Sequence, residues 1–130
     1  RESLNRLSAA LRKSEAPEAR ELAVEVERIQ AGSHDDIEAA LLQRITGGGV
    51  KLKAAEADDA ARLLGRDGPA PEHRLGLPPG TPPPQMRDAV MEALGRWQRR
   101  AENPLSSREV AEAARTLVRT CEGLLADLPA

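Results

Sequence analysis

The two histidines, the single cysteine and two adjacent serines are the first candidates for a chemical role, and none of them has a spacing typical of catalysis. His34 and His73 lie 39 residues apart, and neither has a second metal ligand at zinc-binding spacing. Cys121 lies within an apolar helical repeat, which indicates core packing, because a nucleophilic thiol needs a neighbouring base and an accessible site. Ser106 and Ser107 precede a helical repeat and are interpreted as caps. The sequence therefore predicts no catalytic residue, no metal site and no cofactor.

Two further clusters have structural explanations. The run Gly47-Gly48-Gly49 lacks the Gly-Lys-Ser/Thr of a P-loop and no strand precedes it, so we interpret it as a helix stop. Glu56, Asp58 and Asp59 gather near the start of an expected helix, without the oxygen-rich loop that would complete a cation site. We interpret these carboxylates as a solvated acidic face that suits the helix dipole.

A group of arginines is the remaining candidate site, and it would suit an acidic protein partner. Its members are Arg96, Arg99, Arg100, Arg108 and Arg115. An alternative is that neighbouring glutamates neutralise this group, since residues 86–130 carry 7 basic and 7 acidic side chains. The glutamates concerned are Glu92, Glu102, Glu109 and Glu112.

Composition excludes several classes of function. The 130 residues include 19 basic and 21 acidic side chains, interspersed along the chain, so nucleic acid is not expected as a partner. No stretch approaches the roughly 20 apolar residues that span a bilayer, and no signal peptide is visible at the amino terminus. A single cysteine agrees with a reducing compartment. We expect a soluble, cytoplasmic chain; its 16 Arg against 3 Lys, with abundant Ala, indicate a GC-rich bacterial genome.

The apolar residues favour helices, because the chain has no Phe or Tyr but 17 Leu and 22 Ala. Apolar residues recur at three- and four-residue spacing, which predicts helices over residues 2–14, 16–31, 34–46 and 54–64. Gly32 is the expected stop of the second helix, and Ser33 the cap of the third. Residues 50–53 alternate in a way that fits a short extended connector.

The carboxy-terminal part predicts an antiparallel helical hairpin. Thr81 is expected to cap its first helix, Asn103-Pro104 to end it, and Ser106 with Glu109 to form a capping box for the second. The facing stripes are Met86, Val90, Ala93, Leu94, Trp97 and Ala101 on one helix and Val110, Ala114, Leu117, Cys121, Leu124 and Leu128 on the other.

The fold class predicted is all-α, either a small helical bundle or two helical subdomains joined by a linker. Residues 65–84 contain seven Pro and four Gly, which predicts a linker without regular structure. We therefore expect an amino-terminal helical unit over residues 1–64 and the hairpin over residues 85–130.

Residues 75–128 resemble a J-domain, the co-chaperone module that stimulates heat-shock ATPases. The segment Leu75-Gly76-Leu77-Pro78-Pro79-Gly80-Thr81 resembles the loop that opens the family's second helix, and the next two predicted helices resemble its second and third. Where the family carries His-Pro-Asp after an aromatic residue, this chain has Gln98-Arg99-Arg100 after Trp97. The resemblance therefore implies a degenerate J-like hairpin and no stimulation of an ATPase.

The sequence favours a non-catalytic protein-protein interaction module from a larger bacterial protein, since it begins with Arg1 and not Met. Its expected partner is another protein or the remainder of the parent chain, and self-association is left open. The alternative is a regulatory or stalk segment of a larger nucleotide-hydrolysing protein, such as a dynamin-like GTPase. Such a protein would carry its catalytic motifs elsewhere.

Overall fold

A computed structural model describes residues 33–129 of the chain. The helices predicted over residues 2–14 and 16–31, and the stop predicted at Gly32, lie outside the described residues. The chain divides into two compact units between Ile37 and Glu38, and the contacts given below lie within the second unit.

The all-α fold class is confirmed, since all regular structure within residues 33–129 is helical. The described elements are a helix over residues 33–46, α3 (Ala54–Leu63), α4 (Pro71–Leu75), α5 (Pro83–Glu102) and α6 (Arg108–Asp127). Residues 50–53 connect the first helix to α3 without forming a strand. None of the described helices is long and apolar enough to cross a membrane.

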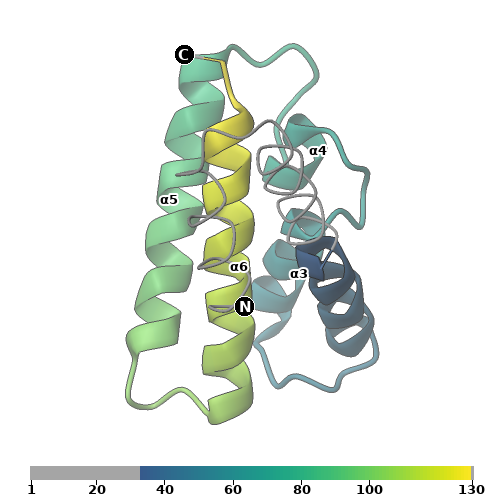
Figure 1. Cartoon of the computed structure of the whole chain (residues 1–130), viewed down its shortest axis with the longest axis vertical. Coiled ribbons are helices and arrows are strands. Elements are labelled where there is room, and N and C mark those ends of the chain that lie inside the picture. The colour runs from purple at the N-terminus through teal and green to yellow at the C-terminus, as the bar shows by residue number, and fades with distance from the viewer. Residues whose placement is uncertain (1–32, 130) are drawn as a thin grey trace, which may run out of the picture. The chain divides into compact units, whose positions relative to one another are not determined.

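Helices α5 and α6 form the predicted hairpin and lie side by side along their length (Figure 1). The seam is filled by the predicted stripes: Val90 and Leu117 are fully buried, and Trp97 is 3% exposed. Leu94 and Ala101 are partly buried against the same core. The three- and four-residue spacing of apolar side chains therefore identified this interface correctly.

Helix α3 packs against α6 and α4, and α4 packs against α5. The buried face of α3 consists of Ala60, Ala61 and Leu63, so small alanines let this helix approach the hairpin closely. Leu41 and Ile45, in the helix over residues 33–46, belong to the same buried cluster. Described residues on both sides of the predicted linker thus share one core.

The expectation that residues 65–84 lack regular structure is wrong at α4, which lies inside that segment. Pro71 occupies the first turn of α4, where a missing N–H costs nothing, and Gly76 ends the helix with a φ of 69°. Arg74 ties α4 to the bundle: its Nε donates to the carbonyl of Leu63 at 2.7 Å, and its Nη2 lies 3.0 Å from Oε2 of Glu38. Leu75 and Leu77 pack against the core.

Two predicted caps are corrected by the structure. The Thr81 hydroxyl donates to the carbonyl of Pro78 at 2.6 Å and closes a turn, so α5 begins at Pro83 without a side-chain cap. Helix α6 is capped by Ser107, whose hydroxyl accepts a hydrogen bond from the N–H of Val110, and not by Ser106. The Ser106 hydroxyl instead forms hydrogen bonds with Arg100 of α5.

Candidate functional site

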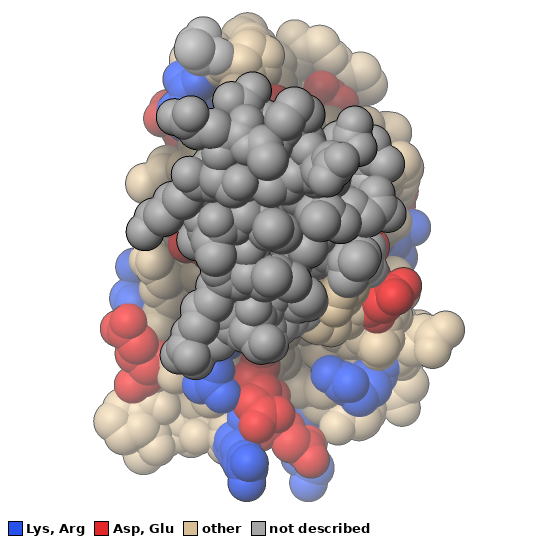
Figure 2. Space-filling view, in the orientation of Figure 1, with Lys and Arg blue, Asp and Glu red and all other residues tan. Residues whose placement is uncertain are grey.

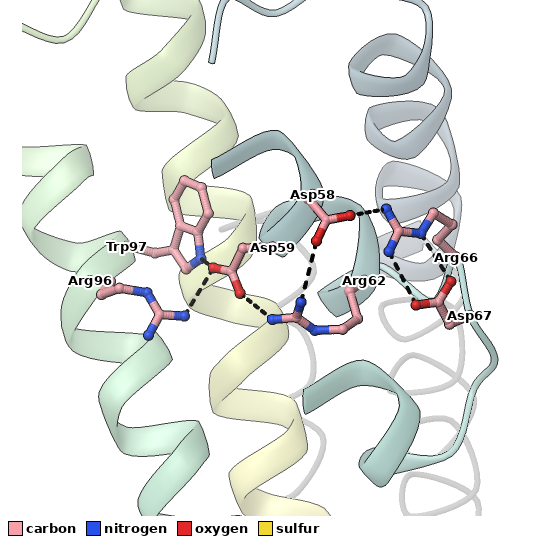
Figure 3. Close-up of polar contacts among 7 residues, drawn as sticks. All are labelled: Asp58, Asp59, Arg62, Arg66, Asp67, Arg96 and Trp97. Atoms are coloured by element: carbon pink, nitrogen blue, oxygen red, sulfur yellow. Dashed lines mark hydrogen bonds and ion pairs between the residues drawn. The ribbon is translucent and has the colours of Figure 1, made fainter. Parts of the chain in front are cut away.

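One carboxylate, that of Asp59, links α3 to α5 (Figure 3). Its Oδ1 accepts from Nη2 of Arg62 at 2.6 Å, within α3. Its Oδ2 accepts from Nη2 of Arg96 at 2.9 Å and from the indole Nε1 of Trp97 at 3.2 Å. The Asp59 side chain is only 16% exposed, and donors from both helices hold it in one position.

A second link between the same helices runs through Glu56 and Arg100. Nε of Arg100 donates to Oε2 of Glu56 at 3.0 Å, while Nη1 donates to the hydroxyl of Ser106 at 2.7 Å. The Ser106 hydroxyl in turn donates to the backbone carbonyl of Arg100, also at 2.7 Å. These bonds fix the end of α5, its connector to α6, and the start of α3 to one another.

An open groove of about 470 Å³ lies where these links cross from α3 to α5. It is lined by Ala55, Glu56, Asp59, Arg96, Trp97, Arg99, Arg100 and Asn103. Its volume is in the range of small-ligand sites. We call it the α3–α5 groove.

The structure brings three of the five predicted arginines, Arg96, Arg99 and Arg100, to the α3–α5 groove. Arg108 and Arg115 are exposed residues of α6 that do not line it. The predicted basic face is therefore divided, with one part in the groove and one part on α6.

Neutralisation by glutamates holds for some of the arginines. Arg96 pairs with Glu92 at 3.2 Å, and Arg108 pairs with Glu112 at 3.2 Å. Arg99 and Arg115 form no ion pair within residues 33–129. Where the surface is coloured in Figure 2, basic and acidic side chains are interspersed and do not form one basic area.

The acidic residues near the start of α3 were predicted to be a solvated face, and this is wrong for two of the three. Glu56 and Asp59 face α5, as described above, and only Asp58 is well exposed, at 59% of its side chain. Asp58 pairs with Arg66 at 2.6 Å (Figure 3). The exposed pair of Arg66 with Asp67 lowers the pKa of the Asp67 carboxyl.

Spacing predicts which charged side chains share a helix face. Glu56 and Asp59 stand three residues apart on α3, and Arg96 and Arg100 stand four apart on α5, so each pair shares one helix face. Spacing does not predict that these two faces meet, so the interhelical partners could not be found from it alone.

Other candidate residues have structural roles. Cys121 is fully buried in the α5–α6 seam, as predicted, and burial is the main reason why the pKa of its thiol is raised to about 12. His73 was expected in a loop but lies in α4, exposed, with its ring against Gly68. Gln98, Arg99 and Arg100 lie within α5, which continues to Glu102, and not in a loop.

Within the described residues, no group of three or more His, Cys, Asp or Glu side chains is placed to hold a metal ion. The fold and the groove define a small all-α bundle with an open groove between two of its helices, in which charged side chains and Trp97 line the walls.

Comparison with known proteins finds a similarity to the isoniazid-induced protein IniC of Mycobacterium tuberculosis, in strains CDC 1551 / Oshkosh and ATCC 25618 / H37Rv. The identity with each is 28% over 106 residues, which cover 82% of this chain and 21% of IniC. The chain thus spans about a fifth of the length of these relatives. No family model matches the chain, and no solved structure matches it significantly.

Proposed function

We propose that residues 38–129 form a non-catalytic interaction module that binds through the α3–α5 groove. The partner is another protein or another part of the parent chain. The observation that carries this proposal is an open groove of about 470 Å³ in which one lining cation, Arg99, has no ion-pair partner among the described residues.

The surroundings of the groove support this proposal, because its walls are held in place before any partner arrives. Asp59 fixes Arg96 and Trp97, and Glu56 fixes Arg100, at the distances given above. A preorganised surface loses less conformational entropy on binding than a mobile one. Such a surface suits recognition of a partner segment.

Site-specific photo-crosslinking in the complete parent protein tests the proposal. A benzophenone amino acid replaces Ala55, an exposed residue that lines the groove, so that Arg99 is kept; in a control it replaces Arg115 on the exposed face of α6. We expect defined cross-links from position 55, to one segment of the same chain or of a partner, and few from position 115. Equal, diffuse labelling from both positions would contradict the proposal.

A second candidate function is a regulatory or stalk segment within a larger nucleotide-hydrolysing protein, such as a dynamin-like GTPase. The similarity to about a fifth of a longer relative favours a segment of a larger protein. This candidate predicts that Asp59→Ala, which loosens the link between α3 and α5, changes the rate of GTP hydrolysis by the complete parent protein. An absence of GTP hydrolysis in that parent, or a rate indifferent to Asp59→Ala, would exclude it.

The J-like character of residues 75–128 stays a prediction, as do the cytoplasmic location and self-association. With Gln98-Arg99-Arg100 in place of His-Pro-Asp, the chain is expected to leave a heat-shock ATPase at its basal rate. Steady-state ATPase measurements with and without the chain would check this expectation.

A further inference from the structure

We infer that the α3–α5 groove binds an acidic segment of a partner protein, with one carboxylate of that segment paired to Arg99. This inference rests on the proposed function and adds the chemistry of the occupant. It is carried by the charges of the groove, the position of Arg99 and the apolar side chain exposed on the α5–α6 connector.

The charges that line the groove do not cancel. Three guanidinium groups, those of Arg96, Arg99 and Arg100, face the two carboxylates of Glu56 and Asp59. Arg96 and Arg100 are each bonded to one of these carboxylates. The remaining positive charge is that of Arg99, and it is the charge available to an incoming anion.

The side chain of Arg99 lies against α5 at a position, Gly95, that has no side chain. Its guanidinium lies over Gly95, one turn earlier in α5, where an added β-carbon would stand 3.2 Å from Nη1. A guanidinium presents a planar fork of N–H donors that matches a carboxylate with two parallel hydrogen bonds. Gly95 thus leaves room for this fork beside the groove.

A carboxylate fits this groove better than a phosphate. A phosphate group carries up to two negative charges and is usually held by several cations or backbone N–H groups. Here one guanidinium is available, because Arg96 and Arg100 are already paired with Asp59 and Glu56, so the second charge of a phosphate would have no partner in the groove. One negative charge therefore matches the site, and the side chains of aspartate and glutamate supply it.

The α5–α6 connector exposes an apolar side chain two residues beyond the groove-lining Asn103. Asn103, which lines the groove, accepts a hydrogen bond from the N–H of Leu105 through its Oδ1 at 2.9 Å, and Ser106 is bonded to Arg100. The connector is thereby held to the groove while the Leu105 side chain remains 91% exposed. A partner segment with an acidic residue and a neighbouring apolar residue would use both features.

The test uses the whole chain and two short peptides with blocked ends. One peptide repeats pairs of glutamate and leucine, and the other has glutamine in place of every glutamate. Binding is followed by NMR on isotope-labelled protein, through the indole N–H of Trp97 and the side-chain Nε–H of Arg99. Trp97 is the single tryptophan, so its indole signal is unambiguous.

We expect the glutamate peptide to shift both signals in a saturable manner and the glutamine peptide to leave them unchanged. Because exposed ion pairs contribute at most about 1 kcal/mol, Arg99→Ala should weaken binding by about two- to fivefold. Arg99→Gln should weaken it similarly, while the control Arg115→Ala should bind as the wild type does. Circular dichroism melts confirm that each variant is folded.

Three results would overturn the inference: equal binding of the two peptides, equal affinities of Arg99→Ala and Arg115→Ala, or inorganic phosphate competing at lower concentration than acetate. Defined cross-links from position 55 combined with any of these results would refute the carboxylate chemistry alone. Loss of both the cross-links and the peptide binding would also refute the proposed function.

Discussion

Replacing Asp59 with alanine tests whether the link between α3 and α5 stabilises the bundle. The indole N–H of Trp97, 3% exposed, would lose its acceptor, and a buried unsatisfied donor costs about 1–3 kcal/mol. The two ion pairs contribute less: the Arg62 and Arg96 side chains are 24% and 41% exposed, so screening reduces each contribution to about 0.5 kcal/mol or below. Alanine is the better helix former by about 0.5 kcal/mol, which offsets part of the loss. The net expectation is about 1–3 kcal/mol of unfolding free energy.

The assay is urea unfolding followed by far-ultraviolet circular dichroism, which does not depend on Trp97. Asp58→Ala is the matched control, because it makes the same change one residue earlier in α3 at a side chain that is 59% exposed. Its effect should lie within about 0.5 kcal/mol. A double-mutant cycle of Asp59→Ala with Trp97→Phe should give a coupling of about 1 kcal/mol. Equal losses at positions 58 and 59, or a coupling near zero, would refute this account of the link.

Three further predictions concern the hairpin. Leu117→Ala removes a fully buried side chain and should cost about 2–5 kcal/mol of unfolding free energy, against under about 0.5 kcal/mol for Arg115→Ala; small, equal losses in denaturant titrations would mean that the seam faces solvent. Gly95→Ala should raise the unfolding free energy by about 0.5–1 kcal/mol, because alanine suits a helix interior and the guanidinium of Arg99 can move aside; a lower thermal midpoint would show that Arg99 is held there. Burial raises the pKa of the Cys121 thiol from 9.0 to about 12, so the unfolded state releases the thiol proton at lower pH than the folded state does. The unfolding free energy should therefore fall as pH rises from 9.0 towards 12. Iodoacetamide should label Cys121 only on unfolding, and rapid labelling of the folded chain would contradict this prediction.

The hairpin could be predicted from sequence because its signal is local and repeated. Val90 and Trp97, like Leu117 and Cys121, recur at helical spacing on a single face, and burial of that face decides the packing. Helix α4 could not be predicted in this way. Five residues cannot sustain a helix by propensity, and α4 depends on Arg74, whose partners are distant in sequence.

The sequence predicted a basic face of five arginines, three of which line the groove, but it did not predict the groove itself. The partners of those arginines were missed because Glu56 and Asp59, near the start of a helix, already have a sufficient local explanation in the helix dipole. Only the tertiary arrangement turns them from solvated carboxylates into interhelical bonds. A pattern of charges on one helix therefore needs a facing pattern on another before it predicts a site.

The segment between α3 and α5 has a consequence for how the chain tolerates changes in length. Arg74 is hydrogen-bonded to the carbonyl of Leu63, and Leu75 packs against the core. The turn from Pro78 to Thr81 projects outward, and a β-carbon at Gly80 would meet no atom within 4 Å. Extra residues at Gly80 would lengthen an exposed loop at little entropic cost. Extra residues at Arg74 would shift its guanidinium away from Leu63 and Glu38. The Gly80 turn is accordingly the place to introduce an epitope tag or a fluorescent label without disturbing the groove.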